Sequence, residues 1–143
     1  MKRIILSLIF VPFAGKAPLE NAHSSSTVLV EVRSGEWPIS LEKTTGKSGA
    51  SYFLQFRDEQ ILTNIVLDTL PFGDLVQLKY FEKALTVLKT GNNGDIAKFK
   101  DYSVKRAESR KEGKWYILRY QWGLTNFQQA EADTLISTIR KLQ

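Results

Sequence analysis

The residues best suited to contact a ligand lie between Lys114 and Trp122, where aromatic and basic side chains are interleaved. If this stretch is one β-strand, alternate side chains face opposite sides of a sheet. The more apolar face, which is the better core candidate, holds Tyr116, Leu118, Tyr120 and Trp122. The opposite face would present Trp115, Ile117, Arg119 and Gln121 to solvent or to a partner.

A second basic segment precedes this strand, and the two are expected to form a hairpin. It contributes Lys98, Lys100, Lys105 and Arg106. Bases could stack on Trp115 while the cations meet phosphates, which is how sheet surfaces bind single-stranded nucleic acids. The candidate ligand-binding residues are therefore Trp115, Arg119, Lys105 and Arg106, with Trp37 as a further aromatic contact. The alternative is an amphipathic strand whose Lys and Arg stems cover apolar rings without any ligand.

The chain offers little for catalysis or for metal binding. It has no cysteine and one histidine, His23, in a Ser-rich stretch, so thiolate chemistry, His clusters and a Ser-His-Asp triad are excluded. The segment Gly46-Lys47-Ser48-Gly49 lacks the earlier glycine of a phosphate-binding loop. We expect no metal and no cofactor. An enzyme stays an open alternative, because carboxylates, tyrosines and lysines can catalyse reactions without a linear motif.

The net charge of +5 is concentrated at the N-terminus. Lys2, Arg3 and Lys16 lie in the first sixteen residues, which contain no acidic residue, so the remainder carries about +2. The high isoelectric point is therefore weak support for a polyanionic partner.

The N-terminus resembles a secretory signal peptide. A basic pair, Lys2-Arg3, is followed by the apolar run Ile4–Val11, which is too short for a stable transmembrane span. The resemblance implies a signal peptide over residues 1–17, a linker over 18–26, and export to the periplasm or the exterior. The alternative is that residues 4–10 form a buried strand of a cytoplasmic protein.

Hydrophobic periodicity predicts the elements that must position these residues. Alternation predicts strands over residues 28–33, 39–44, 52–57 and 61–67, and a hairpin over 98–106 and 115–122. Helical spacing predicts a helix that starts at Leu75, is capped by Asp74 and is stopped by Gly91, with Lys89 in its last turn. Val76, Tyr80, Ala84 and Val87 are expected to widen its buried stripe. Thr125 and Gln128 form a capping box that would open the last helix.

The expected fold is α+β: one antiparallel sheet of about six strands with two helices on one face, in the order ββββαββα. It would form a single domain over residues 27–143. A weak internal echo, at an offset of about 55 residues, places Phe72 on Phe127 and Phe81 on Ile136.

Two functions follow from these observations. The first is a small exported, non-catalytic domain that binds an envelope component, a partner protein or a small ligand. The second is a cytosolic protein that binds single-stranded nucleic acid on the aromatic and basic sheet face. The sequence leaves the partner, the strand order and the oligomeric state open.

Overall fold

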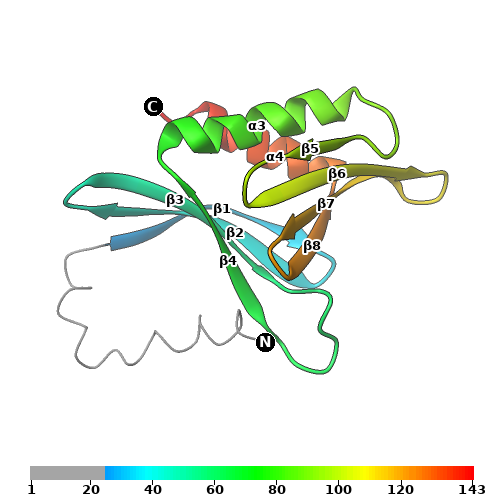
Figure 1. The fold of residues 1–143 in the computed structure, drawn as a ribbon, viewed down its shortest axis with the longest axis horizontal. Coiled ribbons are helices and arrows are strands. Elements are labelled where there is room, and N and C mark those ends of the chain that lie inside the picture. Colours follow the sequence, from blue (N-terminus) through cyan, green and yellow to red (C-terminus); the bar gives the residue numbers. More distant parts are fainter. Residues whose placement is uncertain (1–24) are drawn as a thin grey trace.

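Two four-stranded antiparallel sheets and two helices make up the structure, a computed structural model that describes residues 25–143 (Figure 1). The first sheet contains β1 (Ser25–Ser34), β2 (Trp37–Gly46), β3 (Gly49–Arg57) and β4 (Leu67–Gly73), followed by helix α3 (Leu75–Lys89). The second contains β5 (Ile96–Lys98), β6 (Tyr102–Ser109), β7 (Gly113–Tyr120) and β8 (Gly123–Gln128), followed by helix α4 (Gln129–Arg140). In each sheet, neighbouring strands are consecutive in the chain. The predicted signal peptide, 1–17, and most of the linker, 18–26, lie outside the described residues.

The α+β class is confirmed, but the single sheet of about six strands is wrong. The structure has two sheets, and the element order is four strands and a helix, repeated once. The sequence echo captures part of this repeat, because an offset of 55 residues places β4 and α3 on β8 and α4. Phe72 and Phe127 are both buried at equivalent places. The same offset also places residues 61–67 on residues 116–122, but this part of the echo has no structural counterpart, since residues 61–66 are irregular rather than a strand.

Period-two alternation builds the core face of the first sheet. Leu41, Leu54 and Leu70 lie side by side on adjacent strands, and all three are fully buried. A shift of one residue in either register would turn these side chains to solvent, so the apolar pattern fixes the pairing. Pro71 occupies β4, which lies at the sheet edge, where a missing backbone N–H is tolerated.

Helix α3 agrees with its predicted bounds and cap but not with its predicted width. The Asp74 carboxylate accepts a hydrogen bond from the Gln77 backbone N–H at 3.0 Å. The side chains that reach the core are Leu78, Phe81, Ala84, Leu85 and Leu88. By contrast, Val76, Tyr80 and Val87 are 57%, 51% and 63% exposed, so the prediction that they widen the buried stripe is wrong.

The start of α4 also differs from the prediction. Ala132, Leu135, Ile136 and Ile139 are buried as the periodicity indicates. However, Thr125 belongs to β8, and the N-cap is Gln128, whose side chain makes no capping hydrogen bond. The Thr125 hydroxyl instead donates to Glu59 at 2.5 Å. The capping box was therefore a strand sequence with a coincidental spacing.

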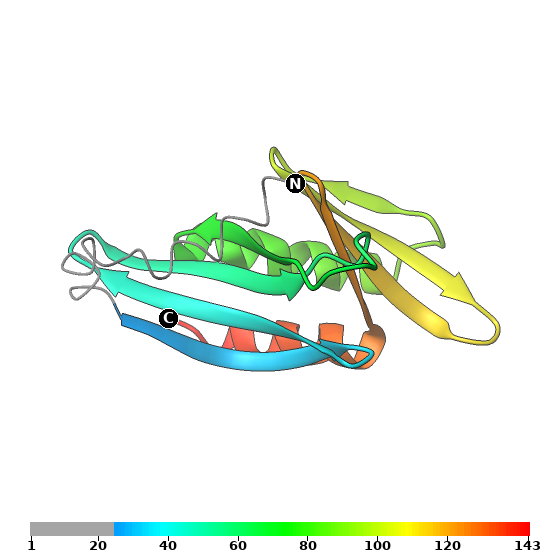
Figure 2. The ribbon, with the colours of Figure 1, turned by 90° about the horizontal axis from the view of Figure 1, so that it is seen from below.

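Both helices lie on the same side of the two sheets and connect them into one core (Figures 1 and 2). Helix α4, from the second half of the chain, packs on β1 of the first sheet, and α3 packs on both β4 and β6. The sheets also meet directly where the loop after β3 reaches β8. There the Glu59 N–H donates to the Leu124 carbonyl at 2.7 Å, and the Leu124 N–H donates to Asp58 at 3.2 Å.

Candidate functional site

The outer face of the second sheet carries most of the residues selected from the sequence. Val104, Tyr116, Leu118 and Phe127 are buried and define the inner face, so the residues between them project outward. In the strand register, Lys105 pairs with Ile117, Ser103 pairs with both Arg119 and Lys98, and all five lie on the outer side. We define the basic face as Lys98, Lys105, Trp115, Ile117 and Arg119.

Among the described residues, the outward positions of these four strands carry basic residues and no carboxylate, and a carboxylate bound at their edge, Glu59, accepts a hydrogen bond from the Asn126 side chain at 2.8 Å. Their cations are Lys98, Lys105 and Arg119, all three exposed. The other outward side chains are apolar or uncharged: Ile96, Ser103, Ala107, Trp115, Ile117, Leu124, Asn126 and Gln128. The modest charge of the domain as a whole therefore conceals a local excess of positive charge.

Trp115 lies on this face between two smaller neighbours. Its partners across the sheet are Ala107 on β6 and Gln128 on β8. The indole is partly buried, and its neighbour on β6 has only a methyl side chain. A flat group could stack there while its charge meets Lys105 or Arg119.

A shallow hollow of about 330 Å³ adjoins the basic face near the turn between β5 and β6. Lys98, Lys100 and Arg119 line it, together with one carboxylate, Asp101. The Phe99 and Tyr102 rings, which also line it, stack with centroids 4.4 Å apart. Burial raises the pKa of the Tyr102 hydroxyl well above its ordinary value. The hollow is thus suited to a small anionic group.

Two of the selected residues do not reach this face. Arg106 is 4% exposed on the inner side, where its guanidinium donates to the Gly91 carbonyl and pairs with Glu108 at 2.7 Å. It therefore anchors the turn between α3 and β5. Trp37 lies in the first sheet, where the Arg57 guanidinium sits 4.2 Å above its ring.

A groove between α3 and β5 is a second candidate surface, which the sequence reading missed. It has a volume of about 450 Å³ and a mostly apolar lining. The exposed fractions of Tyr80, Val87 and Ile96 are 51%, 63% and 48%. The sequence did contain a signal for this groove. The apolar residues of α3 cover more of the helix circumference than a helix packed on one core buries, so some of them must stay exposed.

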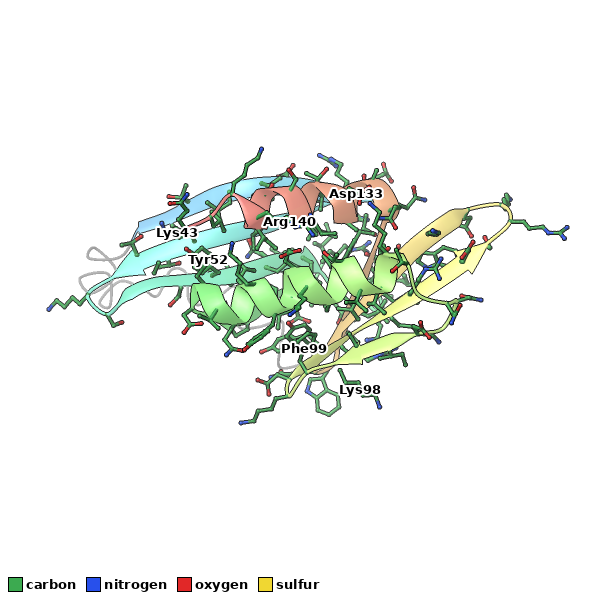
Figure 3. All side chains as sticks on the ribbon, turned by 90° about the horizontal axis from the view of Figure 1, so that it is seen from above. Lys43, Tyr52, Lys98, Phe99, Asp133 and Arg140 are labelled. Carbon is green, nitrogen blue, oxygen red and sulfur yellow. The ribbon has the colours of Figure 1, made fainter. Side chains whose placement is uncertain are left out.

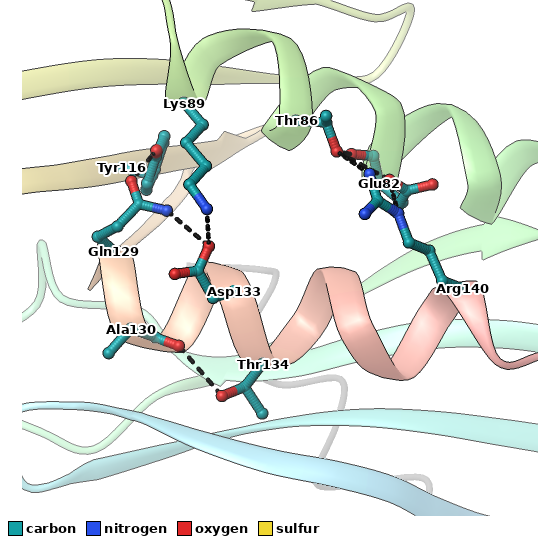
Figure 4. A network of polar contacts seen from close by, with 9 residues as sticks. All are labelled: Glu82, Thr86, Lys89, Tyr116, Gln129, Ala130, Asp133, Thr134 and Arg140. Atoms are coloured by element: carbon teal, nitrogen blue, oxygen red, sulfur yellow. Dashed lines mark hydrogen bonds and ion pairs between the residues drawn. The ribbon is translucent and has the colours of Figure 1, made fainter.

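Polar contacts between the two helices form a structural network (Figure 4). Lys89 Nζ and Gln129 Nε2 both donate to Asp133 Oδ1 at 2.9 Å, and the Tyr116 hydroxyl donates to Gln129. The hydrogen bond from Lys89 holds the pKa of Asp133 below its usual value. These groups satisfy one another, so the arrangement connects α3 to α4 rather than opening a site to a ligand.

No protein-family model matches the sequence, and a search of curated proteins found no similar chain. The case for function therefore rests on the geometry. Within residues 25–143, no group of three or more His, Cys, Asp or Glu side chains is placed to bind a metal ion. Neither helix in this part of the chain is long and apolar enough to cross a membrane.

Proposed function

We propose that this protein is a small exported, non-catalytic binding domain that holds an extended anionic ligand on the basic face. The observation that carries the proposal is the juxtaposition of three exposed cations and one tryptophan at outward strand positions, none of which holds a carboxylate. The cations supply attraction for repeated negative charges, and the indole supplies a flat contact. Export rests on the N-terminal sequence, Lys2-Arg3 followed by the apolar run to Val11.

A second candidate uses the same face in the cytosol. Single-stranded nucleic acid has both features that this surface would recognise, a phosphate at every unit and a base that stacks. The position of Trp115, in the strand that also presents Arg119, favours this ligand specifically. An envelope polymer that carries charge but no base would use the cations alone.

The salt dependence of binding tests the face. Three phosphate contacts, from Lys98, Lys105 and Arg119, predict that log K falls with log salt at a slope of about −2, because each contact on a single strand contributes about −0.7. Full-length protein is titrated with oligothymidylate and with inorganic polyphosphate at several salt concentrations. Arg119→Gln should flatten the slope by about 0.7, whereas Lys47→Gln, in the turn between β2 and β3, should leave it unchanged.

A comparison of oligothymidylate with polyphosphate distinguishes the nucleic-acid-binding protein from a domain that binds an anionic polymer without bases. Trp115→Ala should weaken oligothymidylate about tenfold and leave polyphosphate unchanged if bases stack on the indole. Equal effects of Arg119→Gln and Lys47→Gln, or no binding of either polymer, would refute the basic face as a binding site. Mass spectrometry of the protein from its native host checks export, because an intact Met1-Lys2-Arg3 terminus contradicts a cleaved signal peptide.

A further inference from the structure

The α3–β5 groove combines an apolar floor with an open sheet edge. Ala84, Val87 and Leu88 line its helix side, and Ala97 and Phe99 line its strand side. Strand β5 is the first strand of its sheet and pairs only with β6, so its other side faces the groove's opening. In Figure 3 Phe99 lies beside α3, whereas Lys98 extends away from the helix.

The register of β5 shows which backbone groups point out of the sheet. Arg106 N–H donates to the Asp95 carbonyl at 2.8 Å, and Phe99 N–H donates to the Tyr102 carbonyl at 2.8 Å. Bonding alternates along an antiparallel strand, so Ala97 bonds inward to Val104. The N–H and C=O groups of Ile96 and Lys98 therefore point outward along the free edge. An extended peptide is the ligand that satisfies such a row of groups.

Side-chain alternation determines what that peptide must carry. A strand added beside β5 would direct every second side chain toward the groove, which is apolar, and the others toward Lys98 and Lys105. Lys83 adds a further exposed cation at the groove. The groove's carboxylate, Asp95, already accepts a hydrogen bond from the Asn92 N–H at 2.7 Å. Charge complementarity therefore calls for acidic residues at alternate positions.

We propose that the free edge of β5 and the α3–β5 groove bind an extended segment of a partner protein in which apolar and acidic residues alternate. This site differs from the basic face in its ligand and in its use of α3, although Lys98 and Lys105 contribute to both. A second copy of the chain is a poor occupant. Antiparallel pairing of two β5 edges would bring the Lys98 side chains of both copies onto one face, where like charges repel.

Binding of synthetic peptides to the full-length protein tests the proposal. A capped peptide of alternating valine and glutamate should bind, and one of alternating valine and lysine should bind at least about tenfold more weakly. The valine–glutamate peptide should shift the backbone amide resonances of Ile96 and Lys98, because their N–H groups gain acceptors. The amides of Ala97 and Phe99, which already bond within the sheet, should shift less.

Two matched pairs of variants test the contributions of the β5 edge and of the groove to peptide binding separately. Ile96→Pro removes an outward N–H without breaking the β5–β6 ladder and should weaken the peptide about fivefold, whereas Ile96→Val should have little effect. Val87→Glu places a carboxylate in the groove and should weaken the peptide about tenfold or more. Val76→Glu, on an equally exposed valine of α3 outside the groove, should not.

Three outcomes would overturn the proposal. The first is that neither peptide binds. The second is that both bind equally and Val87→Glu and Val76→Glu have the same effect, which would indicate non-specific adsorption. The third is a concentration-dependent dimer in sedimentation that Ile96→Pro abolishes, which would make a second copy the occupant of this edge.

Discussion

Replacing Gly123 with alanine should destabilise the junction between the two sheets. A Cβ at this position would lie 2.0 Å from Asp68 Oδ2 and 3.5 Å from Phe56 Cε2. Asp68 is 3% exposed and Phe56 is fully buried, so neither side chain can move aside into solvent. Overpacking of a buried site costs about 1–3 kcal/mol. For a domain of this size, we expect the melting temperature to fall by about 3–12 °C.

Gly46 provides a matched control for this prediction. It lies at the end of β2, and a Cβ built there meets no atom within 4 Å. Both substitutions reduce the entropy of the unfolded chain by the same amount, so the difference between them isolates the packing cost. Thermal unfolding followed by circular dichroism, with urea unfolding as a second measure, gives both values. Equal stability of Gly123→Ala and Gly46→Ala would refute the close contact between β4 and β8.

Two further predictions concern the helices. Asp74→Ala should lower the free energy of unfolding by about 1 kcal/mol, because it removes the side chain that caps the Gln77 N–H. Asp74→Ser keeps a capping oxygen and should retain most of this stability. Urea unfolding measures both variants. The pKa of Asp133 is lower in the folded protein than in the unfolded chain, because Lys89 donates a hydrogen bond to its carboxylate. Ionised Asp133 therefore stabilises the fold above about pH 4, and this stabilisation is lost as the pH falls below that. Melting temperatures measured across the acidic range should fall less steeply for Lys89→Met than for the wild type, and parallel curves would contradict the assignment.

The sequence predicted the elements whose local signals agree with their packing. Helix α3 has a strong cap, a regular apolar stripe and a buried face, and its predicted limits are confirmed. The two faces of β7 follow the prediction in part: Tyr116 and Leu118 are buried and Arg119 is exposed. However, Trp122, predicted on the core face, is 66% exposed because the strand ends at Tyr120 and Trp122 lies in the turn that follows. Within β7 itself, a single period decides which side of the sheet each side chain faces.

The secondary-structure predictions failed where one local sequence pattern is compatible with two different structures. The β-branched residues near Ile65 indicated a strand, but the strand begins at Leu67 and continues through Pro71. Thr125 and Gln128 have capping-box spacing, yet tertiary pairing with β7 makes this segment a strand. Strand pairing depends on contacts between distant residues, so the periodicity could not reveal that there are two sheets.

The candidate site was likewise predicted only in part from local sequence patterns. Alternation within β7 places Trp115 and Arg119 on the same side of the sheet, and the pairing of β6 with β7 adds Lys105 to that side. Arg106 was grouped with its basic neighbours because charged side chains are rarely buried. Alternation places the consecutive residues Lys105 and Arg106 on opposite sides of β6, so only one of them can belong to the face. That Arg106 is the buried one depends on the Gly91 carbonyl and on Glu108, which are tertiary contacts. The groove depends on how α3 lies against β5, which is also a tertiary property.

The packing of α4 on β1 sets the order in which this molecule can be completed during synthesis. The helix is the last of the described elements along the chain, and the strand that it covers is the first. Until residues near Ile139 have emerged, the apolar side of β1 lacks its cover, so a nascent chain cannot close its core one half at a time. Removal of α4 should therefore uncover β1 as well as β7 and β8, so the loss is not confined to one half of the molecule.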